Sequence, residues 1–207
     1  HQSLGSLNPG SYLDAPPPGR CCDQCHHPPR KRRGGSSITP ELVSTIWTVP
    51  DSERQLEKTW ILGEITRLGE DSLLKLCQSA AQQRQHAYVP YSHYQVGVAI
   101  LAKSGQVYLG NNVERVSYSE TDHGEEAAIT NAVIQGEVEQ SGRKFLVALA
   151  CAHSGDSAPC GRCRQIMAEH ADNCLVLVAD PKGNVKRVTS LKTLLPYAFT
   201  PTHLGIS

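Results

Sequence analysis

The sequence lacks an excess of charge of either sign, and it lacks a long apolar run. Its 20 Lys and Arg residues balance 20 Asp and Glu residues, so no overall field attracts the protein to nucleic acid or to a membrane surface. No segment approaches the roughly 20 apolar residues that a helix needs to cross a bilayer, and no secretory signal pattern opens the chain. These absences favour a small molecule as the partner, no membrane association and a cytoplasmic protein, with the nucleus and the organelles left open.

Methionine is almost absent as well. The chain begins at His1 and its one methionine is Met167, so we expect the natural start to lie upstream, lost through processing or truncation. A targeting segment in that upstream part would not be visible in this sequence.

Composition along the 207 residues predicts one domain behind an N-terminal extension. Residues 1–37 are rich in Pro, Gly, Ser and Arg and have little to bury, which predicts a disordered tail. Residues 38–68 carry apolar residues interrupted by Pro40 and Pro50, which predicts an extension with short helices. Residues 69–207 form the predicted catalytic domain, a size typical of single domains.

From residue 70 onward, hydrophobic spacing predicts alternating helices and strands. A helical pattern capped by Asp71 or Ser72 ends before Pro90, and a hairpin follows with its turn at 104–105. The later predicted elements are a helix over 125–134, a lengthened loop over 136–144, a strand over 145–151, a helix over 162–170, a strand over 175–179, a strand ending at 188 and a short helix over 191–195. Strands alternating with helices imply an α/β fold with a mixed sheet covered by helices.

Eight cysteines are grouped as metal ligands rather than as a disulfide framework. A chain this long and rich in core residues has no need of disulfides. Cys160 and Cys163 form a C-x-x-C pair, whereas Cys77, Cys151 and Cys174 stand singly in apolar stretches. We expect these three single cysteines to be small buried residues.

The predicted tail contains two motifs of weaker meaning. One is a group of five potential zinc ligands, Cys21, Cys22, Cys25, His26 and His27. No further ligand cluster completes a second zinc site there, so adventitious binding or none is favoured. The basic run over residues 30–33 fits a nuclear signal or a phosphate contact, but a solvated linker is favoured. Nucleic acid is therefore the less favoured partner.

Two short motifs carry the chemistry, His123-Gly124-Glu125 and residues 159–163 (PCGRC). Each stands at the start of a predicted helix, with Pro159 suited to the helix entrance. Cys160 and Cys163 are three residues apart and project from one helix face. Two thiolates and one imidazole supply three of the four ligands of tetrahedral zinc and leave one position for water, as in catalytic sites.

Such a site generates a nucleophile at neutral pH, because zinc lowers the pKa of bound water to about 7. Glu125 can reach that water without binding the metal, and can move its proton to the substrate. Zinc with two thiolates and a neutral imidazole has no net charge, and the helix N-termini favour the ionised thiols. A lone C-x-x-C or H-x-E is a weak signal, but in this order they match the zinc deaminase signature.

The chain resembles the cytidine deaminase family over residues 69–202, about two-thirds of its length. The resemblance is carried by residues 87–94 (AYVPYSHY), 96–97 (VG), 112–114 (NVE), 117–118 (SY), 123–125 (HGE), 159–165 (PCGRCRQ), 194–196 (LLP) and Phe199. It implies a five-stranded mixed sheet with helices on both faces and one zinc ion per active site. It also implies hydrolysis of cytidine and deoxycytidine to uridine and deoxyuridine with release of ammonia, a reaction of pyrimidine salvage.

The resemblance also implies how a nucleoside is bound. Asn112 and Glu114 would hold the ribose, chiefly its 3′-hydroxyl. Tyr94 takes the place of a phenylalanine that packs near the base, and the backbone at Gly124 would meet the pyrimidine carbonyl. Without the resemblance, Asn112 and Glu114 would be interpreted as the ordinary polar end of a strand, and Tyr94 as an amphipathic edge residue.

The C-terminal segment implies a homo-oligomer, with a tetramer favoured. Phe199 or its neighbours would close the site of an adjacent subunit, because residues 194–199 (LLPYAF) are apolar and near the chain end. Tyr118, close in sequence to the ribose motif Asn112-Val113-Glu114, would also lie at this junction between subunits.

Three departures from the family pattern leave the nucleoside preference open. Many small members carry Cys-Ala-Glu-Arg where this chain has His123-Gly124-Glu125-Glu126. With a third thiolate the zinc site would carry a net negative charge, which an arginine could compensate. With histidine as the third ligand the site is neutral and no arginine is needed. Glu126 itself has no assigned role. Gly124 in place of alanine loosens the helix start, and residues 136–144 lengthen a loop.

Two kinds of alternative function stay open at this point. A related enzyme would deaminate cytosine in a polynucleotide or in a nucleoside antibiotic. A protein of another class would use the zinc site without catalysis and bind a partner or nucleic acid through its basic tail. Glu125 argues against the second alternative, since a structural zinc site has no use for a carboxylate beside an open ligand position.

Overall fold

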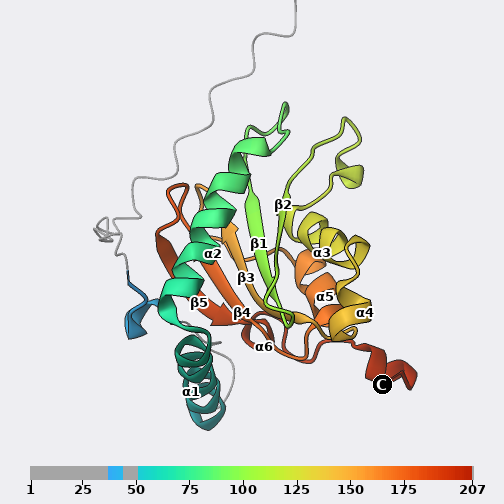
Figure 1. Cartoon of the computed structure of the whole chain (residues 1–207). Helices are drawn as coiled ribbons and strands as arrows, with labels where there is room; N and C mark the ends of the chain where they lie inside the picture. The colour runs from blue at the N-terminus through green and yellow to red at the C-terminus, as the bar shows by residue number, and fades with distance from the viewer. Residues whose placement is uncertain (1–36, 44–50, 207) are drawn as a thin grey trace, which may run out of the picture. The chain divides into compact units, whose positions relative to one another are not determined.

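A mixed five-stranded sheet forms the centre of the structure, a computed structural model that describes residues 37–43 and 51–206. The potential zinc ligands of the tail (Cys21, Cys22, Cys25, His26 and His27) and the basic run over residues 30–33 lie outside the described residues. The strands are β1 (Gly97–Ala102), β2 (Val107–Asn111), β3 (Leu146–Ala152), β4 (Leu175–Ala179) and β5 (Val185–Ser190). They lie in the order β2-β1-β3-β4-β5 (Figure 1), with β3 and β4 parallel and the other neighbours antiparallel.

Helices cover both faces of this sheet, as predicted. The helices are α1 (Asp51–Leu68), α2 (Glu70–Gln83), α3 (Gly124–Ile134), α4 (Glu137–Ser141), α5 (Gly161–His170) and α6 (Leu191–Leu194), with 3-10 turns at Pro40–Leu42, Arg84–His86, Tyr118–Glu120 and Pro201–Leu204. One core cluster joins α3 and α5 to the sheet, and the other joins α1 and α2 to the opposite face. Within β1, Val98 belongs to the first cluster and Ala99 to the second, because successive strand residues point to opposite faces.

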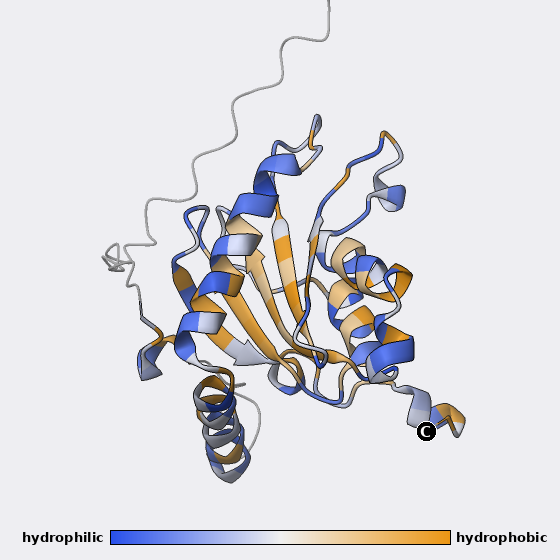
Figure 2. Cartoon of the chain, viewed as in Figure 1, coloured by the Kyte–Doolittle hydropathy of each residue, from blue (hydrophilic) through white to orange (hydrophobic). Residues whose placement is uncertain are grey.

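The two central strands β3 and β4 explain why the core is so apolar. Their sequences LVALACA and LVLVA are nearly continuous hydrophobic runs, which is typical of strands buried on both faces. Figure 2 shows these apolar strands at the centre of the sheet, beside helices that contain both hydrophilic and hydrophobic residues. The three single cysteines Cys77, Cys151 and Cys174 are buried here, as predicted. No helix in residues 37–43 and 51–206 is long and apolar enough to cross a membrane.

The structure differs from the sequence prediction at several boundaries. Residues 51–68 form one 18-residue helix rather than short helices. The N-cap of α2 is Gly69, in the left-handed region with φ 81°, and neither Asp71 nor Ser72 caps it. Pro159 lies before α5, whose N-cap is Cys160, so the proline does not occupy the first helical turn.

The predicted loop over residues 136–144 contains the short helix α4, which begins at a buried acid. Glu137 is fully buried and accepts hydrogen bonds from the Ser104 hydroxyl (2.6 Å) and the Tyr108 hydroxyl (2.8 Å). Burial by itself would raise the pKa of Glu137, but the hydrogen bonds from Ser104, Ser141 and Tyr108 outweigh it and lower that pKa below its usual value. The segment is thus fixed by partners in the β1–β2 hairpin.

Candidate active site

The three predicted metal ligands meet where two helices begin. His123 is the N-cap of α3 and Cys160 is the N-cap of α5, with Cys163 in the first turn of α5. His123 Nδ1 lies 3.4 Å from Cys160 Sγ and 3.3 Å from Cys163 Sγ, and the two sulfurs are 3.5 Å apart. In the described residues, this is the one group of three or more potential ligands that can hold a metal ion.

These distances fit tetrahedral zinc. Zinc bonds of about 2.3 Å to sulfur and about 2.0–2.1 Å to nitrogen place two tetrahedral sulfurs about 3.8 Å apart and a nitrogen about 3.5 Å from a sulfur. The observed separations are within about 0.3 Å of these values. The donor set, two sulfurs and an imidazole nitrogen, is also the one that zinc prefers, so the residues present fit the ion.

Burial opposes the ionisation of the Cys163 thiol. Burial, followed by the nearby Glu125 and Cys160, raises the pKa of the Cys163 thiol far above its usual value. The helix N-terminus favours ionisation of Cys163, whereas desolvation in the buried position opposes it. A bound cation would make a thiolate favourable at this position.

Glu125 lies beside the three ligands without joining them. It stands in the first turn of α3 and is 5% exposed. A pocket of about 240 Å³ is lined by six of the predicted site residues, namely Tyr94, Asn112, His123, Gly124, Glu125 and Cys160. Glu125 thus lines the same cavity as His123 and Cys160, as a proton-transfer group requires.

Gly124 is required here by close packing. A Cβ atom at this position would lie 2.9 Å from the Val98 side chain, a distance that real Cβ atoms do not show. Its φ lies in the helical region at the start of α3. Close approach of α3 to β1 is thus a second reason for glycine here, beside the looser helix start expected from the sequence.

Asn112 holds the backbone that precedes β1. Its side-chain oxygen accepts from the Val96 N–H (2.9 Å), and its side-chain nitrogen donates to the Tyr94 carbonyl (2.8 Å). One N–H of the amide has no assigned partner among these contacts and can face the pocket, since a primary amide carries two donors. Asn112 therefore both shapes the pocket and lines it.

Glu114 is buried at 4% exposure and does not line the pocket. Its carboxylate accepts from the N–H groups of Tyr91 (3.0 Å) and Ser92 (3.2 Å), from the Ser92 hydroxyl and from the Tyr118 hydroxyl (3.1 Å). Burial would raise its pKa, but these hydrogen bonds outweigh burial and lower it. Glu114 is thus ionised at neutral pH and fully occupied by donors of its own chain.

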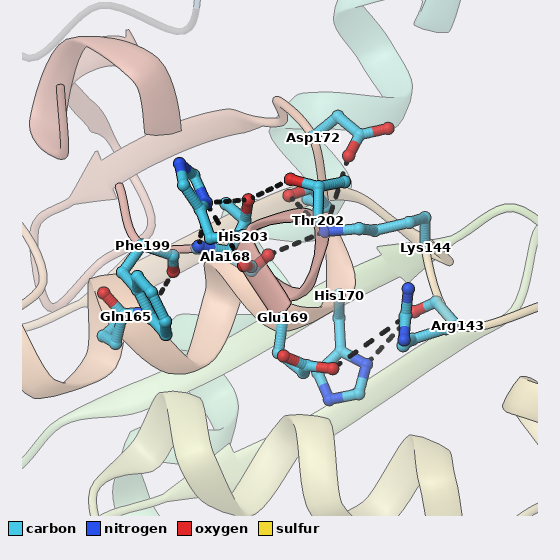
Figure 3. Close-up of polar contacts among 12 residues, drawn as sticks. Arg143, Lys144, Gln165, Ala168, Glu169, His170, Asp172, Phe199, Thr202 and His203 are labelled. Atoms are coloured by element: carbon cyan, nitrogen blue, oxygen red, sulfur yellow. Dashed lines mark hydrogen bonds and ion pairs between the residues drawn. The ribbon is translucent and has the colours of Figure 1, made fainter. Parts of the chain in front are cut away.

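Tyr118 and Phe199 lie away from the pocket within this chain. Tyr118 is 57% exposed and Phe199 is 58% exposed. Figure 3 shows Gln165 of α5 reaching Phe199, whose carbonyl accepts from the Gln165 side-chain nitrogen at 2.7 Å. The Phe199 ring stacks on His203 with ring centroids 5.4 Å apart, and both Tyr118 and Phe199 leave more than half of their surface uncovered.

Sequence reasoning missed two features of the site. Glu126 pairs with Arg162 at 2.8 Å, which joins the first turns of α3 and α5 and gives a structural role to the residue that had none. His153 also lines the pocket, directly after β3. Its position after a buried strand, seven residues before Cys160, was a signal that could have pointed to it.

Comparison with known proteins agrees with this geometry. The family described as the cytidine and deoxycytidylate deaminase zinc-binding region matches residues 70–179. The cytidine deaminase of Sporosarcina psychrophila is 38% identical over 133 residues, covering 63% of this chain and 93% of that protein. The cytidine deaminase of Halalkalibacterium halodurans is 39% identical over 128 residues, covering 60% of this chain and 92% of that protein.

Solved structures show the same relation. The crystal structure of cytidine deaminase from Burkholderia pseudomallei has a TM-score of 0.55 and 35% identity, covering 60% of this chain and 97% of its own. That of Mycobacterium tuberculosis has a TM-score of 0.50 and 40% identity, covering 60% and 94%. With the family match spanning more than half of the sequence, this chain belongs to the cytidine and deoxycytidylate deaminases, as a hydrolase with a zinc-binding region.

Proposed function

We propose that this chain catalyses the zinc-dependent hydrolytic deamination of free cytidine and deoxycytidine to uridine and deoxyuridine with release of ammonia, as a step of pyrimidine salvage. The observation that carries the proposal is the meeting of His123, Cys160 and Cys163 within about 3.5 Å of one another beside the non-ligating Glu125. A closed structural zinc site would have four protein ligands and no pocket.

His123, Cys160 and Cys163 would hold the zinc ion, which when bound supplies a Lewis acid that ionises water near neutral pH. Glu125 would accept one proton of the attacking water and donate it to the ring nitrogen next to the reacting carbon, as the water oxygen bonds to that carbon. The second proton of the same oxygen would pass through Glu125 to the amino group, as the carbon–nitrogen bond breaks and ammonia leaves. The burial of Glu125 in the first turn of α3 keeps the carboxylate next to the ligands through both transfers.

The pocket would orient the base and the sugar. Gly124 is the first residue of α3, where a helix offers no internal acceptor for the N–H, so that N–H would donate to the pyrimidine carbonyl. The free N–H of Asn112 would donate to a ribose hydroxyl. Tyr94, which lines the same pocket, would pack against the base.

Glu114 would accept a hydrogen bond from the ribose 3′-hydroxyl in place of the one from Tyr118. A carboxylate has about four acceptor positions, and four donors already occupy them. Tyr118 belongs to a short, exposed 3-10 turn, so its hydroxyl is the donor that a sugar displaces at least cost. By this exchange, a carboxylate whose acceptor positions are all occupied can still bind a substrate hydroxyl.

We also propose a homotetramer in which Phe199 closes the pocket of a neighbouring subunit. The support is the uncovered apolar surface of the C-terminal segment, where Tyr197 is 99% exposed and Phe199 is 58% exposed. Sedimentation at assay concentration tests this proposal, and an active monomer would contradict it.

The decisive assay is the loss of cytidine absorbance with ammonia release by the purified zinc-loaded protein. Deoxycytidine, cytosine, dCMP and single-stranded DNA are run in parallel. We expect turnover of the two nucleosides and little of the others. Protein with one zinc per chain but no turnover of either nucleoside would refute the proposal, and preferential turnover of single-stranded DNA would replace it by a polynucleotide deaminase.

A further inference from the structure

His153 stands at the wall of the pocket, directly after β3, and is 4% exposed. Its Nδ1 lies 2.8 Å from the Tyr94 hydroxyl, and its Nε2 lies 2.9 Å from the Ser157 carbonyl oxygen. Because a carbonyl oxygen only accepts, Nε2 carries the hydrogen, and a neutral ring therefore accepts from Tyr94 at Nδ1. Burial lowers the pKa of His153, in keeping with that neutral form.

Gly155 provides the space that this pair needs. A Cβ atom at Gly155 would lie 2.7 Å from the Tyr94 hydroxyl oxygen and 3.4 Å from His153 Nδ1. Any side chain there would displace the tyrosine hydroxyl from its acceptor. The φ of Gly155 is not in the left-handed region, so close approach is the reason for glycine at this position.

The contacts join two segments that are distant in sequence. Tyr94 and His153 are 59 positions apart, and they meet because β1 pairs with β3 with Gly97 opposite Ala152. Ser157 in turn stands three residues before Cys160. His153 thus connects Tyr94, in the segment before β1, to Ser157, in the segment that leads to Cys160.

We infer that His153 is a positioning residue that, with the space left by Gly155, fixes the ring of Tyr94 as the wall against which the pyrimidine packs. This inference rests on the proposed function, because it assigns Tyr94 to the nucleoside pocket. It makes His153 a determinant of substrate affinity rather than of the chemical step, since its ring nitrogens are both occupied by the protein.

The test uses variants that separate the two hydrogen bonds of His153. The side-chain oxygen of asparagine lies near the place of Nδ1, so His153→Asn keeps an acceptor for Tyr94. The side-chain nitrogen of glutamine lies near the place of Nε2, so His153→Gln keeps the donor to Ser157 and loses the Nδ1 acceptor. Tyr94→Phe removes the hydroxyl itself.

We expect Tyr94→Phe and His153→Gln each to raise KM for cytidine about three- to tenfold, the effect of one neutral hydrogen bond. The value of kcat and the zinc content should stay within about twofold, and His153→Asn should keep KM near that of the unsubstituted protein. The double variant Tyr94→Phe/His153→Gln should match Tyr94→Phe alone. Effects that multiply instead, or that fall on kcat or zinc content, would overturn the inference.

Gly155→Ala gives an independent arm. It should raise KM in the otherwise unsubstituted protein, and it should have little effect in the Tyr94→Phe background, where the clashing hydroxyl is gone. An equal effect in both backgrounds would count against the inference.

A measurement without turnover separates this inference from the proposed function. The ¹⁵N signals of the His153 ring in the zinc-loaded protein should show the neutral form protonated at Nε2, and the Nδ1 signal should move in Tyr94→Phe. If cytidine is not turned over but these signals behave as expected, the proposed function fails and the hydrogen-bond assignment stands. If cytidine is turned over but Nδ1 carries the hydrogen, the inference fails alone.

Discussion

The neighbouring acids Glu125 and Glu126 offer a matched test of the chemistry. Glu125 is 5% exposed and lines the pocket, whereas Glu126 pairs with Arg162 at 2.8 Å. Substitution of either by glutamine keeps the side-chain shape and removes one charge. The two variants therefore differ in whether the lost carboxylate faces the substrate.

Glu125→Gln should lower kcat by about 10²- to 10⁴-fold, the usual contribution of general acid–base catalysis, which corresponds to about 3–5 kcal/mol of transition-state stabilisation. The zinc content should stay at one ion per chain, because the contacts among His123, Cys160 and Cys163 do not involve Glu125. Glu126→Gln should stay within about tenfold of the unsubstituted protein, since an amide oxygen can still accept from Arg162.

The assay combines initial rates on cytidine with metal analysis of the same samples. If Glu125→Gln keeps its activity within about tenfold while holding zinc, the role assigned to this carboxylate is wrong. If Glu126→Gln loses as much activity as Glu125→Gln, the distinction drawn from their positions is wrong.

Other expected outcomes follow from single contacts. Cys163→Ala should lose zinc and lower the thermal unfolding temperature, because the metal joins α3 and α5; metal analysis and a melting curve check this. Gly110→Ala should destabilise the fold severely, because its Cβ would lie 2.3 Å from the Ala128 nitrogen; the urea midpoint should fall sharply. Glu137 has a lowered pKa in the folded state, so its contribution to stability is present above the unfolded pKa of about 4.3 and is lost as the pH falls through the folded value. Urea midpoints between neutral and acidic pH should therefore decline less in Glu137→Gln than in the unsubstituted protein. A 3′-phosphodiester would lack the hydroxyl donor for Glu114 and bring a like charge to it, so kcat/KM for free nucleosides should exceed that for single-stranded DNA by at least about a thousandfold. Glu114→Gln should weaken the binding of cytidine and narrow this difference in kcat/KM.

The group of three residues that can hold a metal ion could be predicted because its motifs are local. Cys160 and Cys163 share one helix start, and His123 with Glu125 shares another, so spacing alone fixes much of their geometry. The sheet could be predicted for a similar reason, since the apolar runs over residues 146–152 and 175–179 have few other places to be buried.

The remaining features depend on partners that spacing cannot reveal. His153 meets Tyr94 only through the register of β1 against β3. The polar segment that contains Glu137 becomes a helix because Ser104 and Tyr108 supply donors from the hairpin. Helix α1 packs Ile61, Ile65 and Leu68 on the core, but residues 51–59 contain one apolar residue, Leu56, so spacing does not predict the first half of this helix.

Hydrogen bonds to one carboxylate connect helix α1 to the sheet. Glu57 accepts from the Asn173 side chain (3.2 Å) and from the hydroxyl of Ser190, which is also the N-cap of α6.

The two helix starts that hold the metal ligands also have a consequence for the unfolded chain. His123 and Cys160 are 37 positions apart, so an ion held by both closes a loop of that length, as a disulfide would. The chain-entropy relation for such a closure gives about 4 kcal/mol at 25 °C, a large share of the 5–15 kcal/mol that keeps an ordinary domain folded. The zinc concentration would then set the fraction of molecules that are folded as well as the fraction that hold the ion needed for turnover.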